Sequence, residues 1–164
     1  MTFTLYSDKA QYSPSAAPVY SVSLSADKDI CGLKLELIPC AEAFPDAFIV
    51  PELSAVTVSP DSVSVKDAYE KDGIYSLELE LPHLKEVQVQ IPSSVSDRAP
   101  QSNTASLIAD IAYSDSTHED AYSQLTLAKH TPLPLTAALA VAVMLVSAVI
   151  IYLLKRLYFT QTQS

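Results

Sequence analysis

The chain has 164 residues, 49 % of them hydrophobic, and a formal net charge of −9 at pH 7. This length allows one domain and a short additional segment, but not two full domains. Residues 1–131 contain all 19 acidic residues and eight of the ten Lys and Arg residues, a net charge of −11. A domain this acidic repels the phosphate backbone, which excludes nucleic acid as a partner.

Alternation of apolar and polar residues predicts β-strands throughout residues 1–131. Turn-forming residues separate these segments, for example at 25–27 and 71–73. Strands this short and this regularly spaced are typical of an all-β antiparallel β-sandwich. The expected strands lie at residues 3–6, 20–25, 33–37, 56–58, 63–65, 77–81, 87–91, 107–113 and 125–127.

The two cysteines, Cys31 and Cys40, lie on either side of the strand expected at residues 33–37. A disulfide between them is one alternative, although a straight strand of this length would hold their Cα atoms too far apart. Two buried free thiols are the other alternative. The spacing favours the free thiols and leaves both alternatives open.

A long apolar segment follows the acidic region. From Leu133 to Leu154 the chain has 22 consecutive residues without a charge. A helix of this length spans roughly 33 Å, close to the hydrocarbon core of a bilayer at about 30 Å. We therefore expect a β-sandwich domain at residues 1–131, a single transmembrane helix at 132–156 in the lipid bilayer, and a short tail at 157–164.

The orientation of this helix is less strongly indicated. Lys155 and Arg156 favour a cytoplasmic tail, which places the domain in a lumen or outside the cell. Residues 1–15 lack the basic and apolar regions of a signal peptide. Three explanations stay open: an incomplete start, a helix that acts as its own insertion signal, or a tail-anchored protein with a cytosolic domain.

Residues that could carry catalysis are scarce. Residues 117–120 (THED) place one His beside two carboxylates, which on a turn is usually a solvated cluster. Asp115, Glu119 and Asp120 lack the regular ligand spacing of a calcium loop. With only two glycines, the sequence provides neither a phosphate-binding loop nor a nucleophile elbow. We expect a non-catalytic binding protein that uses no metal and no cofactor.

One segment resembles a known family. Residues 31–53 (CGLKLELIPCAEAFPDAFIVPEL) and 75–82 (YSLELELP) are similar to the PIG-X family, the accessory subunit of GPI mannosyltransferase I. The similar features are a Cys-started strand, a Pro after an aliphatic residue, a Phe-rich acidic element and an acidic-aliphatic strand ending in Pro. A later element of that family is reduced here to Ile111-Ala112-Tyr113.

The resemblance implies a non-catalytic subunit in the endoplasmic reticulum membrane, with its domain in the lumen. Such a subunit stabilises a multi-pass membrane glycosyltransferase that acts in GPI-anchor biosynthesis. Phe44, Asp46 and Phe48 are then the candidate interaction residues. Two other classes fit the same layout: a tail-anchored β-sandwich adaptor, similar in layout to the VAP proteins, and a single-pass receptor or adhesion-like ectodomain.

Overall fold

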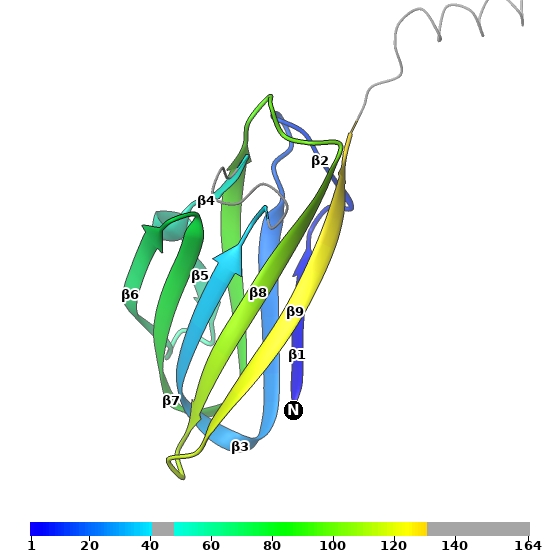
Figure 1. The fold of residues 1–164 in the computed structure, drawn as a ribbon. Helices are drawn as coiled ribbons and strands as arrows, with labels where there is room; N and C mark the ends of the chain where they lie inside the picture. The colour runs from blue at the N-terminus through cyan, green and yellow to red at the C-terminus, as the bar shows by residue number, and fades with distance from the viewer. Residues whose placement is uncertain (41–47, 131–164) are drawn as a thin grey trace, which may run out of the picture. The chain divides into compact units, whose positions relative to one another are not determined.

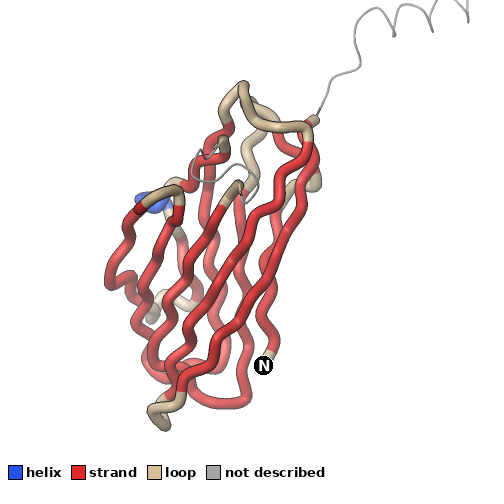
Figure 2. The backbone as a smooth tube through the Cα atoms, in the orientation of Figure 1, coloured by secondary structure: helices blue, strands red, loops and turns tan. Residues whose placement is uncertain are grey.

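The computed structural model describes residues 1–40 and 48–130, which are all-β (Figure 1). Apart from one 3-10 turn, η1 (Leu53–Ala55), the regular structure consists of strands (Figure 2). The described residues form β1 (Thr2–Ser7), β2 (Gln11–Tyr12), β3 (Val19–Ile38), β4 (Ile49–Pro51), β5 (Thr57–Ser59), β6 (Ser64–Lys71), β7 (Ile74–Val95), β8 (Ser102–Tyr113) and β9 (His118–Lys129).

The strands form two packed layers because β3 and β7 each pass from one layer to the other (Figure 1). In the four-stranded layer, the order is β1, the first half of β3, the second half of β7, and β5. In the five-stranded layer, the order is β6, the first half of β7, the second half of β3, β8 and β9. The sequence therefore predicted the class of fold correctly.

Each corner lies where the sequence predicted a break. The register between β3 and β7 shifts between Ser25 and Ile30, at the predicted turn. On β7 the corner follows Pro82, and His83 has a positive φ of 56°. Because both long strands bend together, their pairing continues through the corner. The strands expected at 20–25 and 33–37, and those at 77–81 and 87–91, are thus halves of two bent strands.

The core lies between the layers and follows the alternation along each strand. Leu35, Leu79 and Val89 are at most 3 % exposed. Glu78 and Gln88 are adjacent to Leu79 and Val89 and lie on the outer faces, because successive residues of a strand point to opposite sides. The alternation of apolar and polar residues from which the strands were predicted thus separates inward from outward positions at these residues.

Local pairing explains how the edges are arranged. Asp72 and Gly73 both have positive φ, 53° and 78°, which suits the tight hairpin between β6 and β7. At the opposite side, the Leu5 amide of β1 donates a hydrogen bond to Ser123 Oγ of β9 over 3.0 Å. The short strand β2 pairs with β9 in parallel, so the expectation of purely antiparallel pairing was wrong at this position.

Within residues 1–40 and 48–130, no helix is long and apolar enough to cross a membrane. The transmembrane helix predicted at 132–156 and the tail at 157–164 lie outside the described residues.

Candidate functional site

Of the three candidate interaction residues named from the sequence, the structure describes only Phe48. Phe44 and Asp46 lie outside the described residues. Phe48 is half-buried and packs against the core, and its carbonyl oxygen accepts a hydrogen bond from the Ser96 amide over 2.8 Å. Phe48 directly precedes β4, so these contacts hold the start of β4 in place.

Both cysteines are free thiols. Cys31 lies within β3, and its Sγ donates a hydrogen bond to the Ala112 carbonyl oxygen over 3.4 Å. Cys40 is 2 % exposed, and burial raises the pKa of its thiol. Of the two alternatives left open by the spacing, the structure has the free thiols.

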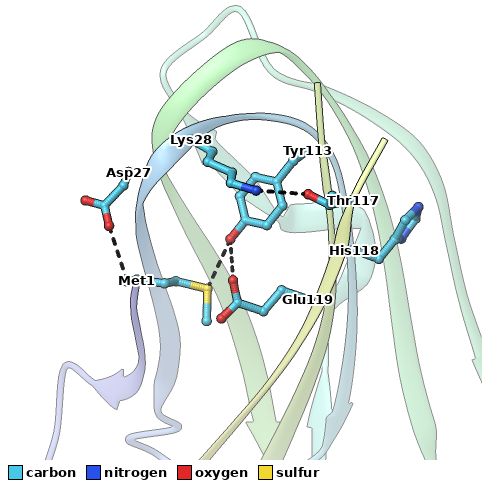
Figure 3. A pocket seen from close by; sticks show the side chains of 7 residues that line it. All are labelled: Met1, Asp27, Lys28, Tyr113, Thr117, His118 and Glu119. Atoms are coloured by element: carbon cyan, nitrogen blue, oxygen red, sulfur yellow. Dashed lines mark hydrogen bonds and ion pairs between the residues drawn. The ribbon is translucent and has the colours of Figure 1, made fainter. Parts of the chain in front are cut away.

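The THED segment is divided between two faces of the sandwich. His118 is the first residue of β9, and its Nδ1 lies 3.0 Å from Asp110 Oδ1 on the outer face of the five-stranded layer. Figure 3 shows Glu119 pointing instead toward Tyr113, whose hydroxyl donates a hydrogen bond to Glu119 Oε2 over 2.8 Å. All four residues of this segment are exposed, as expected of a solvated cluster, but the turn ends before His118 and residues 118–120 begin β9.

The hollow in Figure 3 has a volume of about 280 Å³, and its polar groups bind one another. Lys28 Nζ lies 2.8 Å from Asp115 Oδ2 and 5.4 Å from the centre of the Tyr113 ring. The hydrogen bond from Lys28, together with those from Thr117, holds the pKa of the Asp115 carboxyl well below its usual range. We infer that this cluster is structural and fixes the β8–β9 turn to the corner of β3.

Residues 1–40 and 48–130 contain no group of three or more His, Cys, Asp or Glu residues that could hold a metal ion. The three calcium candidates are dispersed. Asp115 binds Lys28, Glu119 binds Tyr113, and Asp120 lies on the outer face of β9.

Exposed apolar side chains gather on the outer face of the five-stranded layer. Tyr69, Ile108 and Tyr122 are 39 %, 41 % and 58 % exposed. Strand register places them in one row across the layer, because directly paired residues share a face. In order, the row is Tyr69, Ser76, Glu36, Ile108 and Tyr122.

The neighbouring row on this face is mostly acidic. Its members, in order across the same strands, are Asp67, Glu78, Lys34, Asp110 and Asp120. The one lysine is already engaged, since Lys34 Nζ lies 2.7 Å from Glu36 Oε1, and this hydrogen bond raises its pKa. We call the two rows together the tyrosine face.

The tyrosine face was missed from the sequence, although a signal was present. Ile108 is an apolar residue at an outward position, since its neighbours Leu107 and Ala109 point inward. Tyr122 is likewise an aromatic residue at an outward position, between Asp120 and Gln124, the next residues on the same face of β9. The Tyr122 hydroxyl is 3.3 Å from Ser106 Oγ on the adjacent strand, so the side chain reaches across the sheet toward β8.

Comparison with protein-family models gave no match, and neither did a search of curated proteins. Among solved structures, the chain is similar to one that contains manganese lipoxygenase of Gaeumannomyces graminis and part of zonadhesin of Komagataella pastoris. The TM-score is 0.58 at 13 % identity, covering 77 % of this chain and 46 % of that one. The match thus covers less than half of the length of the chain in that structure.

Two bacterial surface proteins share the same fold. The collagen-binding subdomain ACE19 of the Enterococcus faecalis surface protein ACE has a TM-score of 0.52 at 9 % identity, with 77 % of this chain and 95 % of that one covered. The major pilin subunit BcpA of Bacillus cereus has a TM-score of 0.53 at 11 % identity, with 79 % of this chain and 40 % of that one covered. At these identities the likeness establishes a β-sandwich and nothing further about this chain.

Proposed function

We propose that this protein is a non-catalytic binding domain, held at a membrane by residues 133–154, that recognises a partner through the tyrosine face. The observation that carries the proposal is the row of exposed Tyr69, Ile108 and Tyr122. Aromatic residues are enriched at protein interfaces, where they supply a large contact area at a low cost in conformational entropy. Exposed aromatic residues on a solvent-facing sheet therefore indicate a contact surface.

The structural neighbours support the receptor or adhesion-like class. A collagen-binding subdomain of a surface protein and a major pilin subunit are built on the same sandwich. Such a domain holds its strands rigidly and offers broad, flat faces for contact. A domain joined to a membrane by the few residues before the apolar segment would present these faces close to that membrane.

The charge of the tyrosine face indicates a basic partner. Asp67 and Asp120 lie at the two ends of the acidic row, with Glu78 and Asp110 between them. A hollow of about 310 Å³ adjoins this row, and its lining is mixed in charge, since Lys34, Lys66 and His118 line it together with Glu78 and Asp110. Lysine or arginine side chains of a partner would meet the four carboxylates along the acidic row, and complementary charge speeds encounter and fixes orientation.

Site-specific photo-crosslinking tests this proposal. A photoreactive amino acid is placed at position 108 or 122 in the full chain, and at the exposed position 98 on the loop between β7 and β8 as the matched control. We expect a crosslinked partner from 108 and 122 and not from 98, attached through a segment rich in Lys and Arg. Equal labelling from all three positions, or none from 108 and 122, would contradict the proposal.

A second candidate rests on the resemblance of residues 31–53 and 75–82 to the PIG-X family. In this version the protein is a stabilising subunit of GPI mannosyltransferase I in the endoplasmic reticulum, and its partner is the multi-pass enzyme. Residues 75–82 form the first half of β7, in the middle of the five-stranded layer. Residues 75–82 would then contribute by holding together the five-stranded layer, whose outer face contacts the enzyme.

Deletion of the gene separates this candidate from the first. A stabilising subunit predicts a lower steady-state amount of the mannosyltransferase, impaired addition of the first mannose, and partial rescue when the enzyme is overexpressed. A normal amount of enzyme together with normal GPI assembly in the deletion strain would rule the candidate out.

A further inference from the structure

The outer face of the four-stranded layer is almost free of charge. One row across β1, β3, β7 and β5 consists of Thr4, Ser23, Gln88 and Ser59, and the next consists of Tyr6, Ser21, Gln90 and Thr57. We call these two rows the neutral face. Charge returns at the adjoining row on each side, with Glu86 on one side and Asp8, which is bonded to Val19, on the other. All eight side chains of the neutral face are uncharged.

This composition is unusual for a chain with a net charge of −9. The tyrosine face, on the other layer, has five charged residues in a single row. The neutral face lacks the cations that would hold an anionic ligand. It also lacks exposed aliphatic side chains that would hold an apolar one. Ser21 is only 5 % exposed, and the other seven side chains are exposed at least in part. Their hydroxyl and amide groups each donate and accept hydrogen bonds, which matches an uncharged ligand rich in hydroxyl groups.

The shape of the neutral face suits a chain of sugar units. At the β5 edge, Thr57, Ser59, Gln88 and Gln90 line a hollow of about 190 Å³, a size suited to a single sugar ring. At the β1 edge, Tyr6 is 44 % exposed and offers an aromatic ring. Neighbouring strands lie about 4.8 Å apart, close to the advance of one sugar unit in an extended glycan.

We propose that the neutral face binds a neutral, linear polysaccharide that lies across β1, β3, β7 and β5. The Tyr6 ring stacks against one sugar, since the faces of sugar rings carry C–H groups that pack on aromatic rings. The amides of Gln88 and Gln90 bind the hydroxyl groups of another sugar in the hollow. This site is on the opposite layer from the tyrosine face and does not depend on it.

The test uses the full chain in mild detergent and four soluble neutral glycans: laminarin, hydroxyethyl cellulose, dextran and pullulan. Heparin serves as the polyanionic control. Binding is measured by retardation in native gels that contain each glycan. We expect at least one neutral glycan to retard the protein, and heparin to leave its mobility unchanged.

Variants then locate the site. Q88A/Q90A and Tyr6→Ala should each weaken retardation at least tenfold, whereas Tyr6→Phe keeps the ring and should retain binding. The double variant I108S/Y122S on the tyrosine face is the matched control and should bind as the unchanged protein does. Equal thermal unfolding profiles establish that these variants are folded. Retardation by none of the four glycans, or unchanged retardation of Q88A/Q90A, would overturn the proposal.

Discussion

Two fully buried tyrosines, Tyr12 and Tyr20, differ in what their hydroxyl groups bind. Both side chains are 0 % exposed. The Tyr12 hydroxyl donates a hydrogen bond to the Pro100 carbonyl oxygen, whereas the Tyr20 hydroxyl has no partner among the described residues. A buried hydroxyl without a partner loses its hydrogen bonds to water and regains none in the folded state.

We therefore expect opposite effects from removing the two hydroxyl groups. Tyr20→Phe should raise the free energy of unfolding by about 1 kcal/mol, because it removes an unsatisfied group. Tyr12→Phe is the matched control and should lower it by about 0.5–1.5 kcal/mol, since it breaks an existing hydrogen bond. Urea unfolding of the full chain in mild detergent measures both. A loss of stability in Tyr20→Phe would show that this hydroxyl is satisfied.

Tyr113 makes stability depend on pH in the alkaline range. Burial, followed by the hydrogen bond to Glu119, raises its pKa from about 10 to about 12. Since the pKa is higher in the folded state, the contribution to stability is fully present below pH 10. It is lost as the pH rises through 12. The prediction is that Tyr113→Phe loses less unfolding free energy between pH 9.5 and 12 than the unchanged protein does.

Other groups with raised pKa values titrate in the same range, but they are present in both proteins, so their effects cancel in the comparison. These groups are Tyr12, Tyr20, Lys34, Cys40 and Tyr75. The measurement is urea unfolding at four pH values across this range. Parallel pH profiles for the two proteins would contradict the raised pKa of Tyr113.

At the scale of elements, the corner of β7 is set by the backbone at His83. Its φ of 56° lies in the left-handed region, which costs a residue with a Cβ roughly 1–2 kcal/mol. β-branched residues tolerate this conformation least. The bend nevertheless has to occur here, because β7 pairs with β6 before it and with β5 after it.

Substitutions at His83 should therefore rank by backbone freedom. We expect His83→Val to lower the free energy of unfolding by about 1–2 kcal/mol and His83→Gly to leave it unchanged or raise it. Lys85→Gly is the control, since Lys85 lies two residues further along β7 at a position without positive φ, and it should cost about 0.5–1 kcal/mol. Thermal unfolding ranks the variants, and equal losses from Gly at both positions would contradict the strain at His83.

The same elements show how far the sequence could predict the structure. Alternation is a local signal, so the inward positions of Leu79 and Val89 follow from it. The very short strands β2 and β4 have too few residues to display a period. The tyrosine face depends on the pairing of Glu36 with Ile108, and this register joins distant parts of the chain. No local pattern determines such a register, so the face could not be assembled from the sequence.

At the scale of the whole molecule, the two faces of the sandwich differ in chemistry. The tyrosine face combines carboxylates with exposed aromatic rings, and the neutral face offers hydroxyl and amide groups. A sandwich keeps such faces on opposite sides of one core, so that two ligands can bind without competing. Together, the two proposals predict a domain that joins a basic protein segment to a neutral glycan.

Attachment to that membrane is the last prediction, and it concerns the uncharged segment from Leu133 to Leu154. If this segment spans the bilayer, the full chain should remain in the membrane pellet after extraction at alkaline pH. An arginine near the centre of a transmembrane helix costs about 2.5–3.5 kcal/mol for insertion. The double variant V143R/V146R should therefore move to the soluble fraction, while the matched control V143L/V146L stays in the pellet. Release of the unchanged chain by alkaline extraction would contradict a membrane-spanning segment and would leave both binding faces to act without an anchor.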